Sequence, residues 1–270
     1  MASSGQRVWA DRGSYESYVG RWSRLIAKAF LSWLDVPSGS QWLDVGCGTG
    51  ALSETILAIG HPRWIQGIDP SEGYLAHARA RITDERVCFA SGSARALPDG
   101  NPPYDAVISG LVLNFISDID TAVAEMVRVV RPGGTVAAYV WDYAGEMQLM
   151  RYFWDSAVAL NPAARDLDQG RRFPLCQPGP LAYLFRDAGL ENVHTRAIEV
   201  PTVFRDFDDY WSTFLGGQFP GPEYAMSLDE EQRSALREHL RTRLPMAEDS
   251  SISLIARAWA VRGTRTETKA

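Results

Sequence analysis

The chain has 270 residues, of which 46% are hydrophobic and 22% are charged, and its formal net charge at pH 7 is −6. This length suits one large domain or a domain with insertions. Domains that bind nucleic acid usually carry a basic face, whereas the basic runs here are no longer than a pair such as Arg171-Arg172, so we expect no nucleic-acid partner.

The first predicted element is a helix over about residues 14–34. Large apolar and aromatic side chains recur through it at helical spacing, from Tyr15 to Trp33. Pro37 and the residues to Ser40 then turn the chain into a first strand. Most of the apolar stripe on this helix is expected to be core packing.

A strand, a glycine turn and a helix are predicted next. The apolar run 42–45 leads into Gly46, Gly48 and Gly50, and a helical pattern follows over 52–59. Glycine permits positive φ and close approach of a ligand to the backbone. The start of the helix offers free N–H groups and the positive end of its dipole. This pattern predicts a nucleotide site, although the glycine spacing also fits the dinucleotide fingerprint.

Two acids refine that prediction. Asp44 lies two residues before the first glycine, where it would repel a pyrophosphate but attract an ammonium or sulfonium group; capping of the turn is the alternative. Asp69 ends the second predicted strand about 20 residues beyond the turn, where an acid binds ribose hydroxyls in βαβ nucleotide sites. Pro70 and Ser71 then begin a helix, with Ser71 as its N-cap.

These stretches resemble the motifs of class I S-adenosylmethionine-dependent methyltransferases, including the type 11 and ubiquinone/menaquinone enzymes. The first motif is matched by Leu43-Asp-Val-Gly-Cys-Gly-Thr-Gly50, and the acidic end of the second strand by Gly67-Ile-Asp-Pro-Ser71. Later stretches follow in the family's order, with 91–98 at the adenine-contacting loop, 104–109 as the fourth strand and 128–135 as the turn before the fifth. The resemblance covers about residues 38–142 and concerns the cofactor rather than the acceptor.

The alternation of strands and helices predicts an α/β fold with a doubly wound parallel sheet. The resemblance implies a seven-stranded Rossmann-like sheet whose last strand is antiparallel, with helical insertions after strands 5 and 6. We expect a single domain over 1–270, a lid helix at 14–36, and substrate-side insertions at 144–178 and 201–249. Residues 165–177 and 216–222 are predicted to be loops.

The resemblance implies S-adenosylmethionine as methyl donor and S-adenosylhomocysteine as product. Asp44 would orient the methionine ammonium through the turn, and Asp69 would bind the ribose. Ser93 stands where many members of the family carry an acidic residue that contacts the adenine amino group. A serine hydroxyl at this position can still form a hydrogen bond but carries no charge. The implied cofactor-binding residues are Tyr18, Arg21, Asp44, Gly46, Cys47, Gly48, Gly50, Asp69, Pro70, Ser71, Ser93, Ala94, Gly110 and Leu111.

The acceptor is expected to be a small apolar or aromatic molecule methylated at carbon or oxygen. Asn114 is its main polar candidate, because it follows the fourth strand at the centre of the sheet, where ligands bind in such folds. The other candidates are Tyr15, Trp22, Trp141, Tyr143 and Trp211, for which core packing is the alternative. No general base is predicted. Asn101-Pro-Pro-Tyr104 resembles an amino-methylation motif but precedes the fourth strand, so it is rejected.

The three cysteines, Cys47, Cys88 and Cys176, show no paired spacing and predict neither a disulfide framework nor a zinc site. No His, Asp or Glu cluster has ligand-like spacing, so no metal is predicted. No apolar run approaches the length of about 20 residues that spans a membrane, and the N-terminal residues show no positively charged apolar signal region. We expect a cytoplasmic protein and leave its oligomeric state open.

Two other classes of protein stay open from the residues alone. An NAD-dependent oxidoreductase would share the glycine turn and Asp69, although Asp44 and the order of the later motifs argue against it. A non-catalytic protein that binds S-adenosylmethionine for regulation would keep the turn but lack a closed acceptor pocket.

Overall fold

The computed structural model describes residues 21–100, 102–216 and 219–266, which divide into two compact units. The sheet unit comprises residues 24–140, 177–198 and 259–266. The helical unit comprises residues 21–23, 141–176 and 199–258. Each unit has its own buried core.

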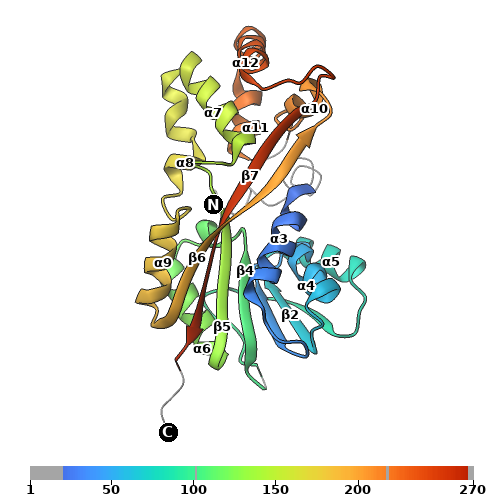
Figure 1. Cartoon of the computed structure of the whole chain (residues 1–270), viewed down its shortest axis with the longest axis vertical. Coiled ribbons are helices and arrows are strands. Elements are labelled where there is room, and N and C mark those ends of the chain that lie inside the picture. Colours follow the sequence, from blue (N-terminus) through green and yellow to red (C-terminus); the bar gives the residue numbers. More distant parts are fainter. Residues whose placement is uncertain (1–20, 101, 217–218, 267–270) are drawn as a thin grey trace. The chain divides into compact units, whose positions relative to one another are not determined.

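The described strands form one seven-stranded sheet in the order β3-β2-β1-β4-β5-β7-β6. β1 pairs in parallel with β2 and β4, β2 with β3, and β4 with β5, and the last strands are antiparallel (Figure 1). The strands are β1 (Gln41–Val45), β2 (Trp64–Asp69), β3 (Val87–Ser91), β4 (Tyr104–Gly110), β5 (Val130–Trp141), β6 (Leu190–Phe204) and β7 (Ile252–Arg265). The predicted fold class is confirmed, including the helical insertions after β5 and β6.

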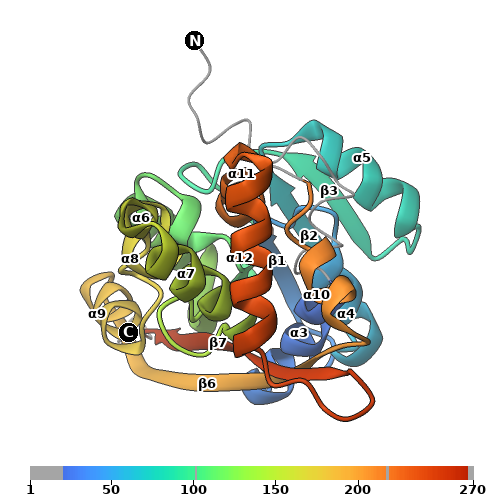
Figure 2. The same cartoon turned by 90° about the horizontal axis from the view of Figure 1, so that it is seen from above.

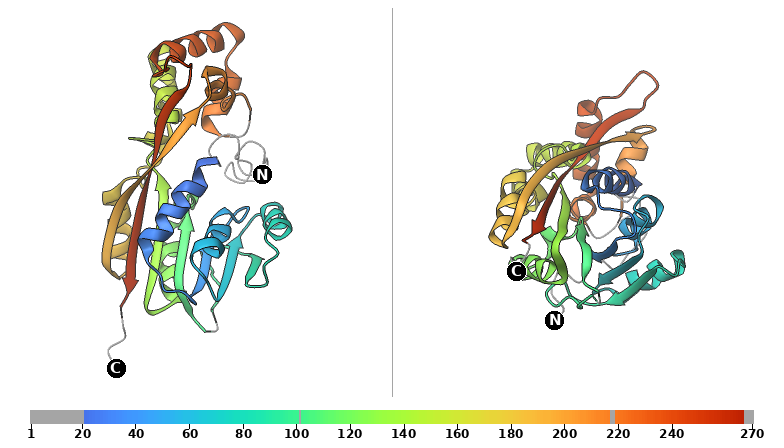
Figure 3. Two further views of the ribbon diagram at one scale, coloured as in Figure 1. Left: turned by 45° about the vertical axis from the view of Figure 1, so that its right-hand side comes forward. Right: turned by 60° about the horizontal axis from the view of Figure 1, so that its bottom comes forward.

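Helices cover both faces of the sheet. They are α3 (Arg21–Leu34), α4 (Ala51–Ile59), α5 (Glu72–Arg81), α6 (Ile119–Val129) and α9 (Pro178–Asp187). α3, α4 and α5 lie on one face, and α6 and α9 lie on the other (Figure 3). Every residue of β1 is buried, as expected for a central strand between two helical layers. On α3, the ring of Phe30 packs 4.7 Å from that of Tyr139 on β5.

The helical unit contains α7 (Gln148–Leu160), the 3₁₀ helix η3 (Pro162–Leu167), α8 (Gln169–Arg172), α10 (Phe207–Ser212), α11 (Pro220–Ser227) and α12 (Glu230–Arg243). α12 packs beside α7 (Figure 2). The core of this unit is aromatic. Phe153 of α7 stacks on Phe214 with ring centroids 4.2 Å apart, and the buried Tyr210 donates a hydrogen bond to the carbonyl of Leu149. Burial of such rings is the main stabilising contribution available to a small unit.

Three local predictions were wrong. Residues 165–177 contain the end of η3 and all of α8, because Asn161 and Asp168 cap these short helices through their side chains. α11 begins inside the predicted loop 216–222, with Pro220 at a first-turn position where its missing N–H costs nothing. The predicted turn 128–135 is largely strand, since β5 starts at Val130, directly after α6.

Candidate functional site

The glycine turn lies at the point where the order of strands reverses. β1 has β2 on one side and β4 on the other, so the chain crosses to one side of β1 and later to the opposite side. Asp44 is aligned with Gly67 of β2 and with Ile108 of β4, which brings the carboxyl ends of the three strands to one edge. Open α/β sheets bind ligands at such an edge. The sheet therefore places residues 46–50 where a cofactor would bind.

The turn is held to β2 by backbone hydrogen bonds. The amides of Gly46 and Cys47 both donate to the carbonyl of Ile68, at 2.7 and 3.1 Å. Gly46 has φ +74°, and a Cβ there would lie 2.6 Å from a methyl group of Val112. Gly48 has φ +53°, and apart from Gly48 and its two chain neighbours no heavy atom of the described chain lies within 4 Å of the position of its missing Cβ. The turn is thus tight at Gly46 and open at Gly48.

Asp69 connects the turn to the next helix. Its Oδ2 accepts a hydrogen bond from the Gly48 amide at 3.0 Å, and its Oδ1 accepts one from the Ser71 amide at 2.8 Å. Ser71 in turn caps α5, because its Oγ accepts from the amide of Tyr74. Burial raises the pKa of Asp69, and the two amide donors act in the opposite direction. Pro70, between them, is exposed.

Asp44 is a buried acid with one oxygen left without a partner. The hydroxyl of Ser53 donates to Oδ2 at 2.7 Å, whereas Oδ1 has no hydrogen-bond partner within the described chain. Burial is the largest cause that raises the pKa of Asp44 to about 7, and the like charge of Asp69 adds to it. A buried carboxylate oxygen without a donor is costly. A cationic group of a ligand at the turn would satisfy it, so the residues here fit the ammonium of S-adenosylmethionine.

The polar groups of Cys47 are occupied within the protein. Its amide bonds to Ile68, its carbonyl accepts from the Gly50 amide at 2.9 Å, and its thiol lies in an apolar cluster with Leu75 and Phe89. Burial raises the pKa of this thiol. A contact between Cys47 and a cofactor is therefore left to van der Waals packing, and it stays a prediction.

The loop after β3 is fastened to α6. Glu125 accepts from the Leu97 amide at 2.8 Å, and Arg128 donates to the Leu97 carbonyl at 2.7 Å. Within the loop, the hydroxyl of Ser93 accepts from the Arg95 amide at 3.2 Å, and Ser93 and Ala96 form an isolated bridge. The loop therefore has a defined shape at the edge of the sheet, and a binding role for Ser93 and Ala94 stays a prediction.

Two unusual features follow β4. Leu111 has φ +60°, a strained value for a residue with a branched side chain, and its amide donates to the Tyr139 carbonyl at 2.8 Å next to Gly110. Asn114, in the 3₁₀ helix η2 (Leu113–Phe115), has both amide atoms buried without a hydrogen-bond partner among the described residues. Backbone strain and unsatisfied buried groups concentrate at functional sites. The end of β4 therefore has the features of a ligand-binding segment.

The remaining predicted site residues lie elsewhere. Tyr15 and Tyr18 are outside the described residues, and Arg21 is the first residue of α3. The buried aromatic candidates belong to the helical unit, where the Trp22 ring packs edge-on to Phe204 and the Tyr143 ring lies 5.5 Å from that of Phe173. They are Trp22, Trp141, Tyr143 and Trp211. Each packs in the core of that unit, and their contact with an acceptor stays a prediction.

Sequence reasoning missed Ser53, the partner of Asp44. Ser53 is fully buried on α4, nine residues beyond Asp44, between the buried Leu52 and Ile56. A polar residue on the inward face of a short apolar helix is the signal that could have found it. It also missed Val112, whose side chain closes one side of the turn at Gly46.

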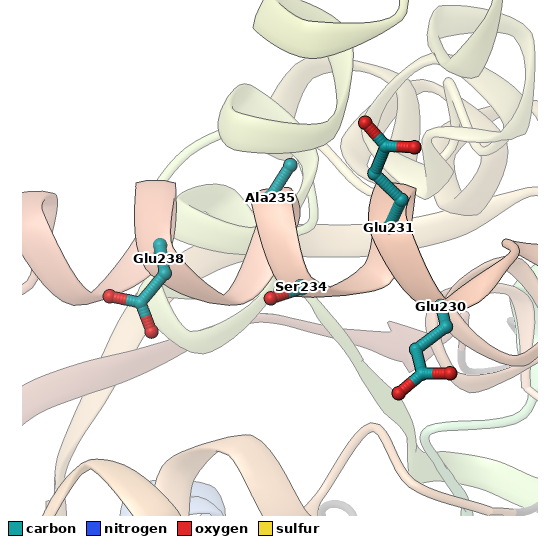
Figure 4. A pocket seen from close by; sticks show the side chains of 5 residues that line it. All are labelled: Glu230, Glu231, Ser234, Ala235 and Glu238. Atoms are coloured by element: carbon teal, nitrogen blue, oxygen red, sulfur yellow. The ribbon is translucent and has the colours of Figure 1, made fainter.

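A hollow of about 510 Å³ over α12 offers no second site of this kind. It is lined by Glu230, Glu231, Ser234, Ala235 and Glu238, and Figure 4 shows the carboxylate of Glu231 on one side of the helix and those of Glu230 and Glu238 on the other. Within the part of the chain that the structure describes, no group of three His, Cys, Asp or Glu side chains could hold a metal ion. The same residues contain no helix long and apolar enough to cross a membrane.

The fold and the turn define an α/β protein with a nucleotide-type cofactor site, and comparison with known proteins agrees. Residues 43–134 match the family model described as a methyltransferase domain. Demethylmenaquinone methyltransferase of Roseiflexus castenholzii is 31% identical over 176 residues, covering 60% of this chain and 72% of that enzyme. The malonyl-[acyl-carrier protein] O-methyltransferase of Erwinia pyrifoliae is 38% identical over 94 residues, covering 35% of this chain but only 34% of that enzyme.

Among solved structures, the fold is shared with phosphoethanolamine N-methyltransferase 2 of Haemonchus contortus in complex with S-adenosyl-L-methionine. That likeness has a TM-score of 0.62 at 16% identity and covers 99% of this chain and 61% of the other. The chain belongs to the class I S-adenosylmethionine-dependent methyltransferases. The family's cofactor is the one predicted from the motifs, and the dinucleotide alternative is set aside.

Proposed function

We propose that this enzyme transfers the methyl group of S-adenosylmethionine to carbon or oxygen of a small aromatic acceptor of the quinol type. Binding of the cofactor is supported mainly by two buried acids, Asp44 near the end of β1 and Asp69 at the end of β2. Gly48, which lies between them in the sequence, has open space at the position of its missing Cβ. Asp44 has a free oxygen for an ammonium group. Asp69, already bonded to Gly48 and Ser71, has further lone pairs for ribose hydroxyls.

The site's contribution to the chemistry is position. S-adenosylmethionine supplies an already activated methyl group, so no metal or covalent step is required of the protein. Asp44 and the turn fix the amino-acid end, and Asp69 fixes the ribose. Holding the reactants in line and away from water can lower a barrier by about 7–11 kcal/mol in favourable cases. In this proposal the acceptor itself ionises or is electron-rich, because no general base stands out at the end of β4 among the described residues.

The acceptor class rests on two observations. Demethylmenaquinone methyltransferase of Roseiflexus castenholzii, of which this chain covers 72%, acts by its name on a quinone. The amide of Asn114, buried and without a partner in the described chain, offers a donor nitrogen and an acceptor oxygen to a phenolic hydroxyl or a carbonyl. The O-methyltransferase relative is matched over about a third of its length, so this match supports the identity of the cofactor more than that of the acceptor.

Titration of the purified protein with S-adenosylhomocysteine, with NAD as the control ligand, tests the cofactor part. We expect saturable binding of the first alone. Asp69→Ala should weaken that binding at least tenfold, whereas Asp187→Ala, an exposed acid of the same unit, should not. Equal affinity of both variants for S-adenosylhomocysteine would show that Asp69 does not bind the cofactor.

Transfer of labelled methyl to a reduced naphthoquinone lacking the ring methyl tests the acceptor part. A malonyl thioester serves as the competing acceptor. Methylation of the quinol supports the proposal. Mass spectrometry of fragments then distinguishes a product methylated at carbon from one methylated at oxygen. Methylation of the thioester alone, or of neither, would contradict the acceptor class while leaving the cofactor result intact.

A further inference from the structure

The helical unit contains a groove of about 1060 Å³. Side chains of α7, η3, α8 and α12 line it together with residues 144–146, and all of them belong to the helical unit. Sites for small organic ligands measure about 300–1000 Å³. The groove is therefore large enough for an organic molecule rather than a single ion, and none of its lining residues belongs to the unit that carries the glycine turn.

The floor of the groove is a fixed ion pair. The guanidinium of Arg151 donates two parallel hydrogen bonds to the carboxylate of Asp168, each 2.8 Å long, and a third to the carbonyl of Tyr143 at 2.9 Å. Asp155 also pairs with Arg151, at 3.1 Å. Gly170 is needed here, because a Cβ would lie 2.7 Å from the Arg151 guanidinium. The charge of Arg151 is thus neutralised within the protein.

The acids that line the groove all have partners. Asp155 and Asp168 bond to Arg151, and Glu146 accepts from the side-chain amide of Gln148 at 2.9 Å. The lining arginines other than Arg151 have no such partners among the described residues. Arg165, Arg171 and Arg243 are exposed and have no side-chain ion pair or hydrogen bond among the described residues.

These three arginines come from separate elements. Arg165 lies on η3, Arg171 on α8 and Arg243 at the end of α12, so the packing of α12 beside α7 brings them to one groove. The groove is lined by four arginines and by Glu146, Asp155 and Asp168, which gives its lining a net charge of +1 although the chain as a whole carries −6. Arginine presents a planar fork of donors that matches the oxygens of phosphate and carboxylate groups.

We infer that this groove binds a small organic molecule through a multiply charged oxyanion group, a phosphate or a polycarboxylate, held by Arg165, Arg171 and Arg243. Tyr152 and Val158, both half-buried on α7, supply an apolar wall for the rest of the molecule. The inference does not depend on the proposed acceptor, since it is drawn from the charges of the helical unit alone.

The experiment uses the full chain and two probes, pyrophosphate and citrate, titrated by calorimetry at low ionic strength. Arg171→Gln and Arg243→Gln are compared with Arg172→Gln. Arg172 is the matched control, because it follows Arg171 on α8, is also exposed and also lacks a side-chain partner in the described chain, but does not line the groove. Melting temperatures of all variants verify that the fold is unchanged.

Saturable binding that falls about tenfold in each groove variant and stays unchanged in Arg172→Gln supports the inference. Arg171→Lys should retain part of the affinity, because the charge remains and the fork is lost. The stronger of the two probes identifies the oxyanion as phosphate or carboxylate. Binding that weakens equally in all three glutamine variants would show general charge attraction and overturn the site, as would failure of both probes to bind the wild type.

Discussion

The carboxylate of Asp69 accepts a hydrogen bond from the amide of Gly48, 21 residues earlier, at a distance of 3.0 Å. Its other oxygen accepts from the Ser71 amide at 2.8 Å. The same side chain that is proposed to bind the ribose therefore holds the glycine turn against the start of α5. An acid at this position serves the fold and the ligand together, so the two roles have to be separated by experiment.

Asp69→Asn is expected to destabilise the protein, because the amide nitrogen that replaces one oxygen cannot accept from Gly48 or Ser71. A buried donor left without an acceptor costs about 1–3 kcal/mol. Urea unfolding measures this loss, with Asp187→Asn as the exposed control. A free energy of unfolding equal to that of the wild type would mean that the turn is held without Asp69.

Asp44 is expected to make stability and ligand binding depend on pH in opposite directions. Burial raises its pKa from 3.8 to about 7, so the folded state retains a proton that the unfolded state releases between about pH 4 and pH 7. The stability contribution of this group therefore falls as pH rises through that range, by up to about 4 kcal/mol. Asp44→Asn should remove this part of the pH dependence, which thermal unfolding at pH 4.5 and pH 7.5 would show.

The same shift predicts proton release on binding. A ligand ammonium beside Asp44 favours its ionised form, so the affinity for S-adenosylhomocysteine should rise between pH 6 and about pH 7.5. Calorimetry at pH 6.5 in buffers of different ionisation enthalpy would detect the released proton. Asp44→Asn should bind weakly and release none. A proton uptake, or an affinity that is independent of pH, would contradict a role for Asp44 at the ammonium.

The sheet could be predicted because its signals are local. Short apolar runs that end in glycine or acid mark the carboxyl ends of β1 and β2, and their alternation with helical patterns gives the winding. In the structure, β1 and β2 pair so that Asp44 is aligned with Gly67. The sequence therefore predicts the glycine turn and the position of Asp69 at the same edge of the sheet.

The partners of these residues could not be predicted, because they depend on packing between distant segments. Nothing in the sequence joins Ser53 to Asp44, and nothing shows that Val112 presses on Gly46. The short helices around Asp168 were also missed, since the bidentate contact between Asp168 and Arg151 forms across a gap of 17 residues. Polar, proline-bearing composition predicts a loop whether or not such contacts exist.

Asn114→Leu is expected to separate function from stability. The side-chain amide has no hydrogen bond to lose within the described chain, and an apolar group of similar size removes the cost of burying it. The melting temperature without ligand should therefore stay equal or rise. The kcat/KM for the acceptor should fall at least tenfold through a higher KM, with the affinity for S-adenosylhomocysteine nearly unchanged. A large loss of stability would instead show that Asn114 supports the fold.

Gly46→Ala tests how closely Val112 confines the turn. Alanine at φ +74° costs about 1–2 kcal/mol in backbone strain, and its Cβ would also lie 2.6 Å from a Val112 methyl group. Gly48→Ala, at φ +53° in open space, carries the strain without the clash and is the matched control.

The two contributions separate in a double-mutant cycle with Val112→Ala. Removing the valine methyl groups should restore about 1 kcal/mol to Gly46→Ala and nothing to Gly48→Ala, a coupling within the range found for residues in contact. Urea unfolding of the four proteins of each cycle provides the numbers. Additive effects at Gly46 would show that the turn shifts away from Val112, and the restriction at Gly46 would then be one of backbone conformation alone.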